Sequence, residues 1–198
     1  MENQEQSLER LRSTAERLKS MYRISKQDVV NTLLVSQGLK PATEAQMLFK
    51  ENTKSDPREE FERNIQELEQ ALSDLGLTYD EQRGHDDDTD MESVHFFIAQ
   101  NEDMKNELVK IADMPVGYAR DREIAKMYGF PETAVDAFTH KKGEIARRED
   151  LPEEMWNSRE RRFASFLPSK EHWREELDTV REKIQKIEII LPGYFDNL

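Results

Sequence analysis

Apolar residues recur along most of this chain at spacings of three and four, which is the pattern of amphipathic helices. The pattern covers residues 8–22 and 25–38 near the N-terminus and is clearest over residues 57–75. Residues 40–52 are also expected to be helical, with a proline placed where a first helical turn tolerates it. The N-terminal part of the chain is therefore predicted to be a set of helices.

The spacing changes after this region. Residues 77–82 and 93–99 are short and rich in β-forming side chains, and a polar, acidic stretch separates them. This arrangement predicts two antiparallel strands joined by an acidic connection. A further helix is expected over residues 102–114, with Asn101 as its cap.

The last apolar stripe is the longest and keeps heptad-like spacing over residues 173–191. Its members are Trp173, Leu177, Val180, Ile184, Ile187 and Leu191. Because each amphipathic face needs a surface to cover it, we expect this helix to pack with residues 8–22 and 57–75 in an intramolecular bundle. The alternative is that it pairs with its own copy in a second chain.

These patterns predict an α+β fold that is mainly α: a helical bundle with one small antiparallel β-hairpin and a helix-turn-helix-like corner. The length of 198 residues suits a single domain over residues 1–198. Within it we expect N-terminal helices in 1–76, the hairpin plus a helix with an acidic loop in 77–113, and the corner and long C-terminal helix in 114–198.

Charge is distributed unevenly along the chain. The net charge is −13, and residues 55–113 alone hold 5 Lys and Arg against 18 Asp and Glu. This segment repels a polyanion, so specific binding of nucleic acid is not expected and any contact would use the two ends of the chain.

Cysteine is absent, which excludes disulfides, thiol nucleophiles and cysteinyl metal sites. A reducing cytoplasm is therefore the expected compartment. No apolar run approaches the roughly 20 residues that span a bilayer, so no membrane association is expected.

One stretch of the C-terminal part has the spacing of a helix-turn-helix corner. Ala125 is followed four residues later by Gly129, and Val135 comes six residues after that. This spacing places a small residue where two helices cross, a glycine at the turn and a branched residue in the second helix. Pro131 belongs to the same motif, and Phe138 is expected to lie on the buried side.

The second helix of this corner lacks the side chains of a DNA reader. Such a helix needs Arg, Lys, Gln, Asn or Ser at its exposed N-terminal positions. Here the chain offers Glu132, Thr133 and Asp136, so two carboxylates would face phosphates. We interpret the motif as a structural corner and keep a nucleic-acid-associated factor as an alternative.

The same stretch resembles a segment of an uncharacterised family of archaeal and other prokaryotic proteins, in which "lGyPxCCxxaF" follows a helix containing Arg and Glu. The matching residues are Arg122, Glu123, Gly129, Phe130, Pro131, Val135, Ala137 and Phe138, and "GLKPA" at residues 38–42 is also similar. The two cysteines of that pattern fall on Thr133 and Ala134, so no thiol or cluster chemistry carries over. The resemblance implies an archaeal or other prokaryotic cytosolic protein.

Candidate metal ligands occur only in the acidic connection, where Asp86, Asp88 and Asp90 alternate. Clustered carboxylates suit a hard cation such as Mg²⁺ or Ca²⁺. A calcium-binding helix–loop–helix would need Gly and Glu where the chain has Met91 and Phe97, so that motif is absent. We interpret the stretch as a solvated turn, with weak cation binding as the alternative.

Candidate interaction residues lie near the start of the corner. Tyr118, Arg120, Arg122 and Tyr128 fall on or near one predicted helix and are candidates for a small anion site, against ordinary helix surface. The chain has no phosphate-binding glycine loop and no HExxH motif, so no cofactor is expected.

Three classes of function remain. A non-catalytic interaction or regulatory protein, with a protein partner or a second copy of itself, fits the heptad-like helix and the uneven charge. An enzyme whose active site is assembled from distant residues is the first alternative, because such sites leave no short motif. A nucleic-acid-associated factor that uses the corner is the second.

Overall fold

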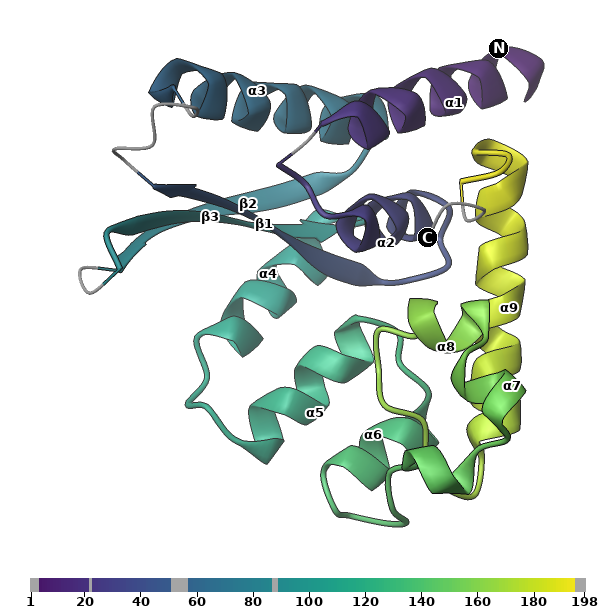
Figure 1. Cartoon of the computed structure of the whole chain (residues 1–198). Helices are drawn as coiled ribbons and strands as arrows, with labels where there is room; N and C mark the ends of the chain where they lie inside the picture. The colour runs from purple at the N-terminus through teal and green to yellow at the C-terminus, as the bar shows by residue number, and fades with distance from the viewer. Residues whose placement is uncertain (1–3, 22, 51–56, 87–88, 195–198) are drawn as a thin grey trace. The chain divides into compact units, whose positions relative to one another are not determined.

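The first part of the chain contains both helices and strands, as the computed structural model shows (Figure 1). In chain order they are α1 (Gln4–Ser20), α2 (Lys26–Ser36), β1 (Ala42–Lys50), α3 (Arg58–Asp74), β2 (Thr78–Asp86), β3 (Met91–Ala99) and α4 (Glu102–Ala112). The structure describes residues 4–21, 23–50, 57–86 and 89–194. The chain divides into two compact units, unit 1 (Met1–Val109) and unit 2 (Lys110–Leu198).

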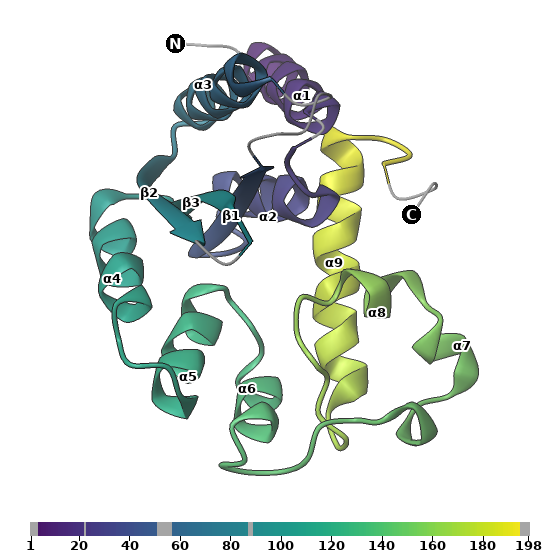
Figure 2. The same ribbon diagram turned by 60° about the vertical axis from the view of Figure 1, so that its left-hand side comes forward.

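Unit 1 is built on an antiparallel sheet with the strand order β1-β3-β2. Its register places His95 of β3 between Gln46 of β1 and Gln82 of β2. Helices α1 and α3 lie side by side over one face of the sheet (Figures 1 and 2). The α+β class with mainly helical content, expected from the sequence, is thereby confirmed.

The core of unit 1 lies between this sheet and the helices. Every second residue of β1 is buried on the helix-covered face, and β3 adds Val94 and Phe96 from the centre. The stripe of α3 meets them with Phe61, whose ring stacks on that of Phe49 at 5.0 Å between centroids. The predicted amphipathic face of residues 57–75 is therefore the face that the sheet covers.

The helix predicted for residues 40–52 is wrong, because residues 42–50 form the strand β1. Ala, Glu, Gln, Met and Leu favour helices in isolation, but pairing with β3 overrides that preference. The sheet consequently has a third strand beyond the predicted pair, and the region 1–76 is not purely helical.

Side chains cover the outer edge of β1. The Nη1 atom of Arg23 donates to the backbone carbonyl of Leu48 at 2.7 Å. The carboxylate of Asp28 accepts the backbone N–H of Gln46, while burial raises the pKa of this carboxyl. An edge strand normally leaves such groups open to another chain, so this edge is protected.

Unit 2 is helical. Its elements are α5 (Tyr118–Met127), α6 (Glu132–Phe138), the 3-10 turn η1 (Arg148–Asp150), α7 (Glu153–Trp156), α8 (Arg159–Phe163) and α9 (Trp173–Ile190). A core cluster of Ala146, Leu151, Trp173 and Leu177 joins the start of α9 to the segment before α7. The pairs Arg159–Glu188 and Arg181–Glu160 then tie α8 to α9.

The three long stripes do not all fall in one unit. Helices α1 and α3 contact each other in unit 1, whereas α9 buries its predicted stripe as an element of unit 2. The intramolecular bundle therefore stays a prediction, as does pairing of α9 with a second copy. Within the described residues, no helix is long and apolar enough to cross a bilayer.

Candidate functional site

The predicted corner is present between α5 and α6. Gly129 has a φ of 66°, and the N–H of Phe130 donates to the carbonyl of Ala125 at 3.0 Å. This bond and the left-handed glycine are the signature of a Schellman turn, which only glycine adopts without strain. Pro131 precedes the first residue of α6, and Val135 is buried.

A lysine from α9 holds this turn from outside. The Nζ atom of Lys183 donates to the carbonyl of Gly129 at 3.3 Å, and burial lowers the pKa of the amine. The contact links α9 to the corner, so the corner is part of the framework of unit 2.

Phe138 does not lie on the buried side as predicted, because its side chain is 45% exposed. Helix α6 ends at this residue, and His140 two positions later has a left-handed φ of 55°. The chain turns away there, so no further helical turn covers the ring.

An ion pair joins the two helices of the corner. The guanidinium of Arg122 in α5 donates to Asp136 Oδ1 at 2.8 Å and to Thr139 Oγ1 at 2.5 Å, both on the α6 side. Lys141 Nζ lies 3.7 Å from the same carboxylate. Arg122, which was predicted as a candidate to bind an anion, therefore already donates hydrogen bonds to acceptors within the chain.

The other three candidate interaction residues are spread along α5. Tyr118 begins the helix and its ring lies edge-on to His140, with 5.7 Å between centroids. Tyr128 follows the helix and contacts Phe130 instead. Arg120 is half-buried between them. Because Tyr118 and Tyr128 lie at opposite ends of the ten-residue helix α5, the four side chains do not form one anion pocket.

The most buried carboxylate among the described residues of unit 2 was not expected from the sequence. Glu176 of α9 is 2% exposed and accepts hydrogen bonds from Thr133 Oγ1 at 2.6 Å, from Ser169 Oγ at 2.6 Å and from the Ser169 N–H at 2.7 Å. In the part of the chain that the structure describes, no cationic side chain pairs with it. We call Glu176, Thr133 and Ser169 the Glu176 cluster; it ties α6 to α9.

A polar pocket of about 280 Å³ lies beside this cluster, lined by Thr133 and Ser169 among others. The exposed carboxylates of Glu132, Glu144 and Glu171 line it, together with Lys142 and His172. Within the described ranges no group of three or more His, Asp or Glu side chains is arranged to hold a metal ion. The pocket therefore has a mixed, mainly acidic lining, and its described residues offer no metal-binding geometry.

Large apolar side chains are exposed where α5 begins and α6 ends. Val116 is 86% exposed, Tyr118 57% and Phe138 45%. The ring contact between Tyr118 and His140 brings these two helix ends together. We call Val116, Tyr118 and Phe138 the open end of the corner.

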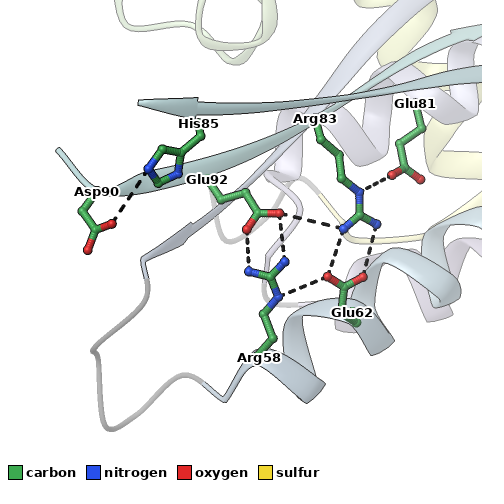
Figure 3. A network of polar contacts seen from close by, with 7 residues as sticks. All are labelled: Arg58, Glu62, Glu81, Arg83, His85, Asp90 and Glu92. Atoms are coloured by element: carbon green, nitrogen blue, oxygen red, sulfur yellow. Dashed lines mark hydrogen bonds and ion pairs between the residues drawn. The ribbon is translucent and has the colours of Figure 1, made fainter. Parts of the chain in front are cut away.

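A charged network on unit 1 contrasts with the neutral donors around Glu176. Figure 3 shows Arg83 of β2 bound to Glu62 of α3 at 3.0 and 3.2 Å and to Glu81 at 2.6 Å. Arg58 of α3 binds Glu92 of β3 at 2.5 and 3.1 Å. The hydrogen bond from Arg83 lowers the pKa of Glu62, and Glu62 in turn raises the pKa of Arg83. We call these five residues the Arg83 network.

The structure describes two of the three candidate metal ligands in the acidic connection. Asp86 Oδ1 accepts the backbone N–H of Thr89 at 3.3 Å, and Asp90 lies 4.0 Å from His85 Nε2 (Figure 3). Asp88 lies outside the described residues. Weak binding of a hard cation at Asp86, Asp88 and Asp90 stays a prediction.

A polar contact on the sheet face opposite to α1 and α3 was also not predicted from the sequence. His95 Nδ1 lies 2.5 Å from Glu44 Oε1, and Gln46 Nε2 lies 3.0 Å from His95 Nε2. The register of β1 against β3 brings these side chains together. The helix predicted for residues 40–52 hid this contact, because it separates Glu44 and Gln46 from His95. The alternation of the apolar residues Ala45, Met47 and Phe49 was a signal for a strand.

Searches against protein families, curated proteins and solved structures find no match to this chain. The resemblance around Gly129 to an archaeal and prokaryotic family therefore stays a prediction.

Proposed function

We propose that this chain is a non-catalytic interaction protein that binds a protein partner through the open end of the corner. The observation that carries the proposal is the exposure of Val116, Tyr118 and Phe138 at two neighbouring helix ends. Large apolar and aromatic side chains that remain exposed together are typical of protein-binding surfaces.

The polar clusters support a non-catalytic role. Glu176 receives three hydrogen bonds from within the chain, and Arg83 is paired with three carboxylates. Groups held in this way stabilise a fold, whereas a catalytic group needs reach to a substrate atom. We therefore rank an enzyme with a non-local active site second.

Contacts of α6 argue against a nucleic-acid reader. Thr133 is bound to Glu176, and Asp136 is bound to Arg122. These are positions that a recognition helix would present to DNA, and Glu132 beside them would repel phosphates. A cytoplasmic location fits the proposal because the chain has no cysteine.

The test is affinity capture from host lysate with the parent and a Tyr118→Ser/Phe138→Ser variant, quantified by mass spectrometry. We expect a specific partner to bind the parent at least about tenfold more than the variant, since aromatic anchors dominate interface energies. Ile189→Ser is the matched control, because Ile189 is another exposed apolar residue of unit 2, at 60% exposure on α9. Equal capture by all three proteins would contradict the proposal.

A further inference from the structure

The two edge strands of the sheet in unit 1 differ in whether side chains cover their outward backbone groups. On β1, the side chains of Arg23 and Asp28 occupy outward backbone groups of Leu48 and Gln46. The other edge is β2, which pairs with β3 on one side only. An edge strand can add a strand from another chain if its outward backbone groups are open.

The register shows which residues of β2 point outward. In an antiparallel ladder, the N–H and C=O of one residue point to the same side, and successive residues alternate. Leu48 and Gln46 point away from β3, so the odd-numbered residues of β1 face β3. Following the register across the sheet, the backbone groups of His95 point toward β2, where Gln82 is its partner in the register. The backbone groups of Tyr79, Glu81 and Arg83 therefore point away from the sheet.

These outward groups have no cover in the described part of unit 1. The loop and turn hydrogen bonds of the backbone involve none of Tyr79, Glu81 and Arg83. Their side chains bind Glu69 and members of the Arg83 network, which lie on the helix-covered face rather than along the edge. The edge of β2 is open where that of β1 is closed.

We propose that β2 pairs antiparallel with β2 of a second copy of this chain, with Gln82 opposite Gln82 at the two-fold axis. This arrangement joins the two sheets into one and closes both open edges at once. It is independent of the partner surface at the corner.

The outward backbone groups of β2 permit more than one register, and charge favours the one centred on Gln82 over its two neighbours. With Gln82 at the centre, Glu81 of each copy lies opposite Arg83 of the other, and Asp80 lies opposite Gly84. Opposite charges across a strand pair stabilise it, and like charges destabilise it.

The neighbouring registers fail this test. Centring the pair on Glu81 places two glutamates opposite each other. Centring it on Arg83 opposes two arginines and also sets Asp80 against Asp86. Of these three registers, the one centred on Gln82 is the one that avoids like charges between neighbours of the axis.

Cysteine cross-linking tests the register directly, because the parent chain has no cysteine. Gln82 would form a non-hydrogen-bonded pair with its copy, at about 4.5 Å between Cα atoms, which a disulfide can bridge. We expect Gln82→Cys to give a covalent dimer under mild oxidation. Asp80→Cys is the matched control on the same strand and face; its two copies would lie roughly 13 Å apart, beyond the reach of a disulfide.

Light scattering and circular dichroism complete the experiment. We expect the parent to shift from monomer to dimer over about two decades of concentration. Glu81→Arg should weaken the dimer at least about tenfold by opposing Arg83, and Glu81→Arg/Arg83→Glu should recover part of this loss in a folded protein. A parent that remains monomeric overturns the proposal. The proposal is also overturned if a folded Gln82→Cys variant cross-links no better than Asp80→Cys. If the parent is nevertheless a dimer by light scattering, pairing through α9 is the remaining explanation.

Discussion

The Glu176 cluster in unit 2 and the Arg83 network in unit 1 both gather polar side chains, but they differ in burial and in charge. Glu176 is buried and is held by two hydroxyls and one amide, all neutral. Arg83 is partly exposed and is held by carboxylates. Removing a buried carboxylate leaves its donors without partners in a dry environment, whereas water replaces the lost partners of an exposed ion pair. The stability of unit 2 is therefore expected to depend more strongly on a single side chain, Glu176, than the stability of unit 1 does on Arg83.

The largest effect is expected for Glu176→Ala. The change leaves the N–H and hydroxyl donors of the buried Ser169 without an acceptor and also removes the partner of the exposed Thr133. We expect it to lower the free energy of unfolding by about 3–5 kcal/mol. Urea unfolding followed by tryptophan fluorescence is the measurement, because Trp156 and Trp173 both lie in unit 2.

A milder change in the same cluster sharpens this result. Thr133→Val removes one donor and leaves the carboxylate with its two bonds from Ser169, so it should cost only about 1 kcal/mol. If Glu176→Ala proves no more destabilising than Thr133→Val, the carboxylate is not the centre of the cluster.

A smaller effect is expected for Arg83→Met in unit 1. The exposed pairs of Arg83 should contribute about 1 kcal/mol, a value that falls as salt screens the charges. Unfolding monitored by far-ultraviolet circular dichroism at low and high salt measures both quantities. A loss as large as that of Glu176→Ala, or one that is insensitive to salt, would abolish the contrast between the two regions.

The smallest effect concerns the pH dependence of Glu62. Its folded-state pKa is lowered below the usual 4.5 by the hydrogen bond from Arg83. A lowered pKa in the folded state means that the stabilisation is present above pH 4.5 and is lost as the pH falls through the folded value. We expect the stability difference between the parent and Glu62→Gln to be present at neutral pH and to disappear in acid. A difference that grows on acidification would contradict this assignment.

Local signals in the sequence were sufficient for much of the fold. Ser25 caps α2 by accepting the N–H of Asp28 at 3.0 Å, and Asn101 Oδ1 accepts the N–H of Met104 at 3.0 Å. The stripe of α9 is buried, and Gly129 makes the predicted turn. Each of these features depends on residues that are close together in the chain.

Features that depend on distant residues were missed. β1 is a strand because β3, more than forty positions later in the register, pairs with it. Glu176 is buried because Thr133 and Ser169 bring donors to it from other segments. Phe138 is exposed because the chain turns away after it. Periodicity in a single segment contains no information about such partners.

The protected edge of β1 has a consequence for behaviour in acid. Burial raises the pKa of Asp28, so this side chain becomes protonated at a higher pH than an ordinary aspartate. Protonation weakens its hold on the Gln46 N–H and uncovers this part of the β1 edge, while Arg23 still covers the carbonyl of Leu48. A chain with one open edge can only form closed pairs, whereas a chain with two open edges can grow into an open-ended filament. With β2 paired as proposed, acidification that protonates Asp28 would therefore raise the upper limit of self-association above two chains.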